Sequence, residues 1–557
     1  MESVRFSDRF PILCESFTKP SAGENNNCYC DFSRFSVEFC SSESGGNPAS
    51  EREGGKLPSK EATRLRFEFC EREIDSMRMS MFDTNVQELK YKVLREVARL
   101  AFEDKLETDL IKIPEKIMPG PQATLRCCIY KERAIITERV KLAMGGDKEN
   151  DNVVEVLDIA CDECPVTQMS VGEACRGCIA HRCMNVCPRG AISLIDHKAH
   201  IDPKKCVSCG KCLNVCPYNA ISKNLRPCEK ACKANAIAMD EDKKARIDND
   251  KCVACGACVY QCPFGALMDK SYILDAISIL KNSANNKNYK VYAIVAPSIS
   301  GQFGNAKIGQ VVSGLKELGF YNVVEAALGA DMVANKEAQE LYEKGFLTSS
   351  CCPAFVSYIK INFPSMVEHI SHNLSPMATI AEYLKKMDPS AKIIFIGPCI
   401  AKKAERKLDR VKDIIDVVIT FEELLALFDS RNIEIQDLPN DVLDNASYYG
   451  RIFARSGGLT DAVRQGLKEN GITEEDFDYK PVTCSGIDEC RIALLKASKN
   501  VLGGNFIEGM ACESGCIGGA ACLTHGPKDK SEVDKYSREA MEKTIKDAIG
   551  VLQLSDK

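Results

Sequence analysis

The sequence predicts an α/β domain with parallel sheets in two lobes, preceded by a small α+β region with cysteine repeats and by a mainly helical N-terminal region. Three observations predict this order. Sixteen of the 31 cysteines fall within residues 161–262 of the 557-residue chain. After them, short apolar runs alternate with helical stretches, as in parallel sheets covered by helices. Before them, apolar residues follow three-to-four spacing from Thr84 onward.

We expect four parts along the chain. Residues 1–60 are rich in Ser, Asn, Glu and Gly and lack apolar periodicity, so we expect disorder. Residues 61–150 should be helical, with helices from Thr84 and over 131–144, and Cys127-Cys128 is interpreted as a buried structural pair. Residues 151–270 should bind several metal clusters. Residues 271–557 should be catalytic, with strands near 291–296, 323–324, 392–396 and 416–420, helices over 308–318 and 421–428, and a C-terminal helix over 531–553.

Composition excludes several classes of protein. The balance of 73 Lys+Arg against 79 Asp+Glu gives a net charge of -6, which offers nucleic acid no overall attraction. No apolar run is long enough to span a membrane, and the first residues lack the apolar core of a secretory signal. We therefore expect a cytoplasmic protein. Disulfides are rare in that compartment, so metal ligation is the leading explanation for the cysteines.

Two stretches of the cysteine-rich region repeat each other. Each contains C-x-x-C-x-x-C-x-x-x-C-P, at Cys206–Pro217 and Cys252–Pro263, preceded by a C-x-x-x-C. This is the ligand run of bacterial ferredoxins, in which the fourth cysteine binds the neighbouring 4Fe-4S cluster. A zinc site would leave the extra Cys-Pro unexplained.

Crossed ligation divides the cysteines into sets of four. Three sets are predicted to bind accessory 4Fe-4S clusters: Cys187, Cys206, Cys209, Cys212; Cys232, Cys252, Cys255, Cys258; and Cys175, Cys178, Cys183, Cys216. The remaining four, Cys161, Cys164, Cys228 and Cys262, form a possible fourth cluster. The alternative is that these four are unligated, which leaves three clusters. Such clusters carry single electrons to or from a redox site.

Three loops with cysteines follow in the α/β part. They are Thr348-Ser-Ser-Cys-Cys-Pro353, Gly397-Pro-Cys-Ile-Ala-Lys-Lys-Ala-Glu405, and Glu508-Gly-Met-Ala-Cys-Glu-Ser-Gly-Cys-Ile-Gly-Gly519. Pro398-Cys399 follows a strand, where α/β proteins place their sites. Gly515, Gly518 and Gly519 allow close approach of backbone to a bulky cofactor. On the residues alone, the protein is interpreted as a metal-cluster oxidoreductase.

The three loops resemble the signature motifs of the [FeFe]-hydrogenases, and the arrangement resembles the group B type of anaerobic bacteria. The resemblance implies an H-cluster, a 4Fe-4S cube joined to a di-iron centre with CO, cyanide and a dithiolate bridge. It implies cube ligands at Cys352, Cys399, Cys512 and Cys516. It also implies proton transfer by Cys351, cyanide binding by Lys402, packing by Met510 and a proton-relay serine at Ser371. Reversible hydrogen formation from protons, ferredoxin as electron carrier and dedicated maturation proteins are implied as well.

Departures from the family pattern give further expectations. Gly397 replaces a methionine, so one side of the pocket is expected to be more open. Gln302 stands where the family often has a glutamate, so we expect a different proton route, through water or Glu325. Cys484, Cys490 and Cys522 are expected to pack in the core. Two alternatives stay open: an iron-sulfur assembly protein of the hydrogenase-like type without a di-iron site, and a hydrogen sensor, although no sensory domain is recognisable.

Overall fold

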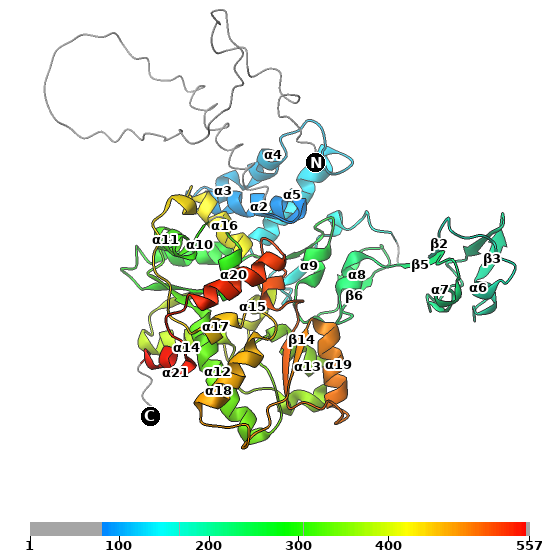
Figure 1. Cartoon of the computed structure of the whole chain (residues 1–557). Helices are drawn as coiled ribbons and strands as arrows, with labels where there is room; N and C mark the ends of the chain where they lie inside the picture. The colour runs from blue at the N-terminus through cyan, green and yellow to red at the C-terminus, as the bar shows by residue number, and fades with distance from the viewer. Residues whose placement is uncertain (1–80, 166–167, 305, 553–557) are drawn as a thin grey trace, which may run out of the picture. The chain divides into compact units, whose positions relative to one another are not determined.

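The computed structural model describes residues 81–165, 168–304 and 306–552 (Figure 1). The predicted disorder of residues 1–60 lies outside these residues.

The larger lobe is built on a four-stranded parallel sheet. Its strand order is β10 (Asn322–Glu325), β9 (Val291–Val295), β12 (Lys392–Gly397) and β13 (Val417–Thr420), and every neighbouring pair is parallel. The strands are Val- and Ile-rich and almost completely buried, as sheets covered on both faces must be. Helices α10 (Ile273–Asn282), α11 (Ile308–Glu317), α14 (Pro376–Met387) and α16 (Phe421–Ser430) share its core.

The smaller lobe contains a second parallel sheet, in the order β11 (Leu347–Thr348), β15 (Phe506–Met510) and β14 (Pro481–Ser485). Helices α13 (Pro353–Asn362) and α19 (Ile487–Ala497) pack with it, while α12 (Ala326–Lys344) lies against α18 (Gly458–Glu469). The predicted two lobes with parallel sheets are confirmed. Each signature loop directly follows a strand, namely β11, β12 or β15.

The cysteine repeats fold into two similar modules. The first holds β2 (Gln168–Val171), α6 (Arg182–Asn185), β3 (Ile192–Ile195), β4 (Lys198–Ile201), α7 (Lys211–Val215) and β5 (Ile221–Asn224). The second holds α8 (Pro227–Ala231), β6 (Ile237–Met239), β7 (Ala245–Ile247) and α9 (Ala257–Gln261), with β1 (Val154–Val156) paired to β8 (Leu267–Asp269). In each module a hairpin separates two short helices, which confirms the predicted ferredoxin-like α+β fold.

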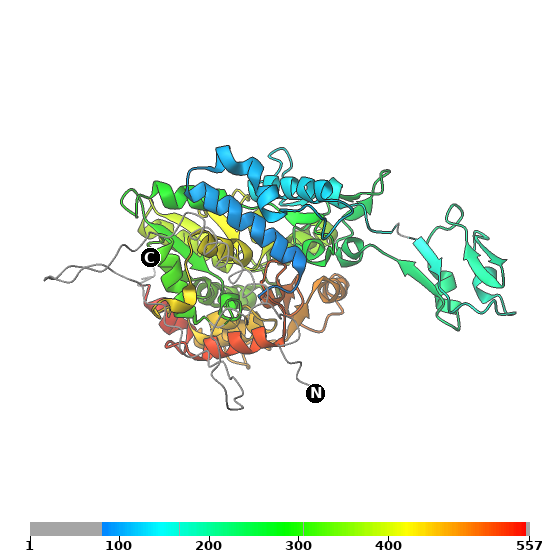
Figure 2. The same cartoon turned by 90° about the horizontal axis from the view of Figure 1, so that it is seen from above.

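The N-terminal helices pack on the larger lobe. Helix α2 (Asn85–Phe102) begins where Thr84 caps it, and its apolar stripe, Val93, Leu94, Val97 and Leu100, is buried as predicted. Figure 2 shows α2 lying across α16, with which it shares a core. Helices α3 (Leu106–Asp109), α4 (Ile113–Ile117) and α5 (Ile129–Ala143) follow.

Buried charges also connect α2 to the rest of the protein. Lys90 pairs with Asp269 at 2.5 Å and with Glu422, while Lys403 pairs with Asp269 at 2.8 Å and with Glu423 at 2.9 Å. All five side chains are buried. The network joins α2, the end of the second module, the second signature loop and α16.

The predicted C-terminal helix over 531–553 is wrong as a single element. Two helices form instead, α20 (Pro527–Arg538) and α21 (Ile545–Gly550). Thr544 begins the second, because its side chain accepts a hydrogen bond from the Asp547 N–H and so caps a new helix. The sequence pattern of this segment did not show that one helix ends and a second begins at Thr544.

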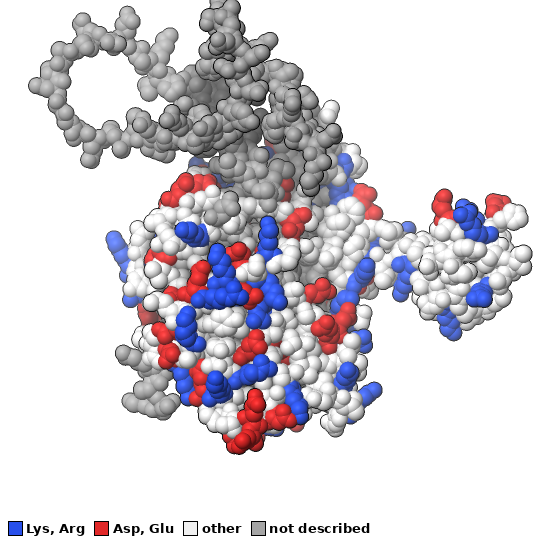
Figure 3. Space-filling view, viewed as in Figure 1, with Lys and Arg blue, Asp and Glu red and all other residues white. Residues whose placement is uncertain are grey.

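Charge and hydropathy agree with the sequence expectations. Lys/Arg and Asp/Glu side chains are interspersed over the face of the molecule in Figure 3. Among the described residues, no helix is both long and apolar enough to cross a membrane.

Candidate metal centre

The three signature loops meet between the two lobes. Cys352 caps the N-terminus of α13, Cys399 caps α15 (Ile400–Glu405), and Cys512 and Cys516 follow β15. The Ala521 N–H donates to the Pro398 carbonyl at 3.1 Å, which fastens the third loop to the second. The carboxyl ends of strands from both sheets therefore bring the loops to one place.

The four predicted cube ligands face one another there. The four thiols are half-buried and interact electrostatically with one another. Burial, together with the neighbouring thiols of the set, raises the pKa of Cys399 to about 11 and that of Cys516 to about 12. Metal binding here would have to release protons. Four soft donors in a closed site suit an iron-sulfur cluster.

Among the described residues, no three His, Cys, Asp or Glu side chains lie close enough to share a single metal ion.

A buried hydroxyl near these thiols lacks a hydrogen-bond partner of the kind that a cofactor would supply. Ser298, on the 3-10 helix Pro297–Gly301 after β9, is 1% exposed, and its hydroxyl has no partner among the described residues. The Ala296 N–H donates to the Ile396 carbonyl at 2.9 Å, so Ser298 lies at the same sheet end as Cys399. A buried hydroxyl without a partner is costly, so an acceptor on a bound group would stabilise it.

Lys402 supplies a buried positive charge. Its Nζ donates to the Cys351 carbonyl at 3.3 Å and pairs with Glu405 at 2.7 Å. Burial alone would lower the pKa of Lys402, but the Glu405 carboxylate more than offsets this, so the ammonium stays charged. Met510, 2% exposed, closes the end of β15. The residues fit an anionic iron-sulfur group.

A buried carboxylate stands next to Cys351, and sequence reasoning missed it. Glu337 on α12 is fully buried, and its Oε1 accepts from the Ser350 N–H and hydroxyl, both at 3.3 Å. Its Oε2 has no partner among the described residues. Burial raises the pKa of Glu337 to about 7, although the neighbouring Ser371 and Ser350 act to lower it. Burial also raises the pKa of the Cys351 thiol, and the Glu337 carboxylate raises it further.

From Glu337 a line of polar groups reaches the surface. The Ser371 hydroxyl lies near Glu337 and lowers its pKa, and it donates a hydrogen bond to Glu340 Oε2 at 3.3 Å. Glu340 then contacts His372 Nδ1 at 2.6 Å, and the His372 side chain is 75% exposed. The available sequence signal was two glutamates three residues apart, which share one face of a helix.

The structure shows the surroundings of Glu325 and Gly397, the two residues on which the sequence expectations for this region rest. Glu325 accepts two 2.8 Å hydrogen bonds from Arg451 and one of 2.6 Å from Tyr536, so it forms a buried ion pair, and its part in the proton route stays a prediction. The site is not more open at Gly397, because a Cβ there would come within 2.7 Å of the Phe395 ring. Gln302 is structural too, since its Oε1 accepts from the Leu523 N–H at 2.6 Å.

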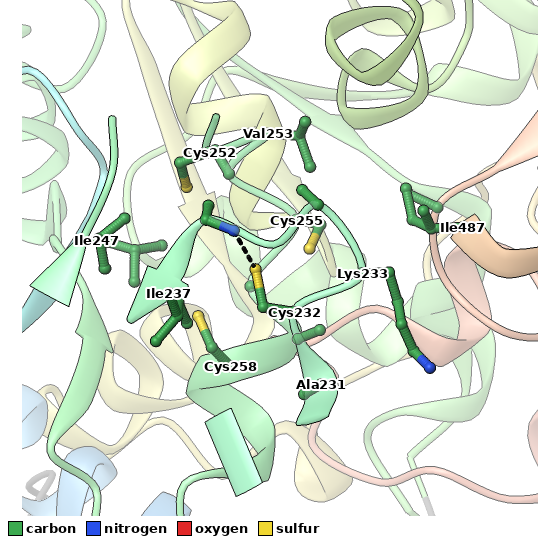
Figure 4. Close-up of a pocket in the computed structure, with 17 residues that line it drawn as sticks. Ala231, Cys232, Lys233, Ile237, Ile247, Cys252, Val253, Cys255, Cys258 and Ile487 are labelled. Carbon is green, nitrogen blue, oxygen red and sulfur yellow. Dashed lines mark hydrogen bonds between the residues drawn. The ribbon is translucent and has the colours of Figure 1, made fainter. Parts of the chain in front are cut away.

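Three cavities in the cysteine modules are lined by cysteines. The largest, about 50 Å³, is lined by Cys232, Cys252, Cys255 and Cys258 (Figure 4). The others, about 30 Å³ and about 20 Å³, lie in the first module. The former is lined by Cys175, Cys178, Cys183 and Cys216, and the latter by Cys187, Cys206, Cys209 and Cys212. The structure thus brings together each of the three crossed sets.

The cavity of Figure 4 adjoins the signature loops. Ala511, the neighbour of Cys512, lines it, and the thiols of Cys255 and Cys512 interact electrostatically. Gly256 takes a φ of +78°, and a Cβ there would come within 2.4 Å of Ile400 and 2.9 Å of Ala520. Glycine therefore allows this loop to contact the second and third signature loops directly.

The remaining cysteines divide into buried and exposed ones. Cys161, Cys228 and Cys262 are buried in one core cluster, and Cys164 interacts electrostatically with Cys262. Cys484, Cys490 and Cys522 are buried, as expected of core residues. Cys127 and Cys128 are exposed, so their interpretation as a buried pair is wrong. They precede α5 at its start, where they are exposed to solvent.

Comparison with known proteins places these observations in a family context. Residues 289–520 match the family described as iron only hydrogenase large subunit, C-terminal domain. Residues 205–265 match a 4Fe-4S double cluster binding domain, and residues 174–220 match a 4Fe-4S dicluster domain. The fold and site therefore define an iron-sulfur protein in which 4Fe-4S domains precede a hydrogenase-type domain.

Three individual proteins are similar to parts of this chain. Iron hydrogenase 1 of Clostridium pasteurianum is 29% identical over 309 residues, which cover 46% of this chain and 54% of that protein. The cytosolic Fe-S cluster assembly factor NAR1 of Botryotinia fuckeliana is 32% identical over 142 residues, 22% of this chain and 25% of that protein. The apo [FeFe]-hydrogenase HydA1 from Chlamydomonas reinhardtii is a structural neighbour at 19% identity and a TM-score of 0.42, covering 51% of this chain and 93% of that one. Residues 289–520 thus resemble the C-terminal domain of iron-only hydrogenases, and the chain spans about half the length of the curated hydrogenase that it matches.

Proposed function

We propose that the protein catalyses reversible hydrogen oxidation and proton reduction at an H-cluster, with electrons relayed through 4Fe-4S clusters to or from ferredoxin. The observation that carries this proposal is the meeting of four thiols, Lys402 and the Cys351–Glu337 pair in one closed site. An H-cluster bound there would supply the iron at which protons and electrons combine. Cys352, Cys399, Cys512 and Cys516 would hold its cube.

The protein's own residues manage the proton. Cys351 holds a proton at its Sγ beside the cofactor space and exchanges it with Glu337, whose pKa of about 7 suits both directions near neutral pH. Ser371 and Glu340 pass it toward His372 and solvent. Lys402 holds and orients an anionic ligand of the cofactor, since a charged donor binds more strongly than a neutral one.

Electrons reach the site through the cysteine modules. Three accessory 4Fe-4S clusters at the three cysteine-lined cavities account for twelve of the cysteines. The cluster held by Cys232, Cys252, Cys255 and Cys258 adjoins the signature loops and would deliver electrons to the cofactor. Ferredoxin as the carrier, dedicated maturation proteins, membership of group B and a cytoplasmic location belong to the same proposal.

A second candidate function is iron-sulfur cluster assembly without hydrogen turnover, which the similarity to NAR1 favours. The buried Cys351–Glu337–Ser371 line argues for the enzyme, because an assembly factor has no need of a proton route to its cube.

Infrared spectroscopy separates the two functions. The chain is expressed with and without hydrogenase maturation proteins and purified without oxygen. We expect bands of iron-bound CO and cyanide only after maturation, together with hydrogen evolution from reduced ferredoxin. Matured protein without those bands would favour the assembly function. Bands without turnover would favour a hydrogen sensor.

A further inference from the structure

The two cysteine modules repeat each other in hydrogen bonds to sulfur as well as in sequence. In the first module, Cys187 and Cys216 each accept from the backbone N–H four residues further on, at 3.3 and 3.4 Å. In the second, Cys232 and Cys262 do the same, both at 3.2 Å. Cys262 is therefore placed as a ligand in the way that Cys216 is, although no assigned cluster uses it.

The repeat extends to the upstream cysteine pairs. In the first module the Ala199 N–H, on strand β4, donates to Cys175 Sγ at 3.3 Å. In the second the Ala245 N–H, on strand β7, donates to Cys161 Sγ, also at 3.3 Å. Both alanines occupy the same position before the C-x-x-C-x-x-C run of their module. Cys161 therefore stands in the second module where Cys175 stands in the first.

We infer that Cys161, Cys164, Cys228 and Cys262 bind a further 4Fe-4S cluster, and that the first module is inserted within the second. In this arrangement the second module starts at Cys161-x-x-Cys164, is interrupted by residues 165–225, and resumes before Cys228. The inserted module leaves and returns through the antiparallel pair β2–β5. The four correspond in order to Cys175, Cys178, Cys183 and Cys216, which line one cavity.

Local structure brings the four together despite their separation in sequence. Cys161 follows β1 and Cys262 precedes β8, and these strands pair, with the Leu157 N–H donating to the Ala266 carbonyl at 2.7 Å. Cys228 lies on α8, which packs against α9. Cys161, Cys228 and Cys262 share one buried cluster of side chains.

Two buried arginines lie beside these thiols, and their positive charges would be stabilised by a nearby anion. Arg226 is 2% exposed and donates to Cys161 Sγ at 3.8 Å and to the Lys243 carbonyl at 2.6 Å. Arg139, on α5, is 3% exposed, lies within electrostatic range of Cys262, and has no partner for its Nε and Nη1 among the described residues. Within the described part of the chain, neither has a carboxylate partner.

A buried unpaired guanidinium is strongly unfavourable. A cluster with four thiolates is an anion and would compensate both charges. The same placement gives α5 of the N-terminal region a function, which is to cover this cluster and supply one of its cations. The Cys228 and Cys258 thiols also interact electrostatically, so the cluster would stand next to the cavity of Figure 4 in the electron route.

The test counts iron and sulfide in the full chain, produced without maturation proteins and reconstituted without oxygen. The double variant Cys161→Ser/Cys164→Ser is compared with Cys127→Ser/Cys128→Ser, whose cysteines are exposed and outside every set. We expect the former to lose about four irons per chain and one reduced-cluster signal in electron paramagnetic resonance, and the latter to lose neither. Equal iron content in both would overturn the inference.

A single substitution gives a second variant for the case that the double variant does not fold. Cys164→Ser changes the least buried member of the set, so we expect a folded chain in which one cluster signal shifts and the others stay. An unchanged spectrum would also overturn the inference. Hydrogen turnover of the matured wild-type protein is measured separately. If the proposed function fails there, the iron count still tests the further cluster.

Discussion

The two cysteine modules share ligand spacing and hydrogen bonds to sulfur, but their surroundings differ. The first has a small core of its own, formed by Met169, Ile192, Ala199, Ile201, Cys212 and Ile221, and Cys209 is exposed. The second shares a core with α5 and with Ile400 and Ala521 of the signature loops. Local spacing thus sets what a module binds, while its neighbours set what the module is used for. The first suits exchange with a surface partner, and the second suits delivery to the catalytic site.

A large effect is expected from substituting the same ligand position in each module. Cys258→Ser should lower ferredoxin-driven hydrogen evolution by about 100-fold or more, equivalent to about 2.7 kcal/mol in activation free energy, because its cluster adjoins the signature loops. Cys212→Ser, the matching position in the first module, should have a clearly smaller effect with a small dye donor that bypasses that module. Equal losses with the dye would contradict the division of roles.

Substitution of Glu337 should block proton transfer and leave electron transfer through the accessory clusters unchanged. Glu337→Gln should lower turnover by about 10²- to 10⁴-fold, because the amide cannot accept the Cys351 proton. The accessory clusters should still be reduced by ferredoxin, and Glu343→Gln, on the exposed side of the same helix, should behave as wild type. Reduction of the clusters that fails together with turnover would argue against a separate proton route.

Titration of the same carboxyl gives a pH signature. Burial raises the pKa of Glu337 to about 7, so the group is protonated below that pH and ionised above it. Because its folded-state pKa exceeds the unfolded value, stability contributed by the neutral form is lost as pH rises from the unfolded value through about 7. We expect a carboxylic acid infrared band that disappears over this range and is missing from Glu337→Gln. A band that persists at pH 9 would contradict this assignment.

The charge network should stabilise the second module and leave the first unaffected. Lys90→Met removes the partner of Glu422 and one partner of Asp269, and breaking such a buried pair costs about 3–5 kcal/mol. Lys92→Met, on the same helix, removes a more exposed pair with Glu88 and should cost at most about 1 kcal/mol. Thermal unfolding followed at the cluster absorbance measures both. If Lys90→Met lowers the free energy of unfolding no more than Lys92→Met does, the buried network adds no more stability than an exposed ion pair.

The smallest effect concerns the arginine on α5. Arg139→Gln removes a buried positive charge near Cys262, so reduction of the nearby cluster should become harder and its potential should become more negative. Arg133→Gln, on a more exposed part of α5, is the control. Redox titration that gives equal potentials in both variants would contradict a cluster at that position.

Sequence reasoning was most successful where the signal is local. Strands β9, β12 and β13 and helices α2, α11 and α16 lie where periodicity predicted them, because burial dictates their apolar residues. The three crossed sets of cysteines follow from spacing alone. Glu337 and Glu340 escaped prediction, because only the tertiary fold brings α12 against the loop of Cys351. Exposure of Cys127 and Cys128, and the capping of α21 by Thr544, likewise depend on neighbours that a linear pattern does not contain.

The pairing of β2 with β5 places the two ends of an inserted domain side by side. A domain joined in this way can be gained, lost or exchanged during evolution without changing the fold of the rest of the chain. The reason is that the two connections to the rest of the chain lie next to each other. The length of the electron chain would then vary by recombination at a single short segment, while the catalytic core stays constant.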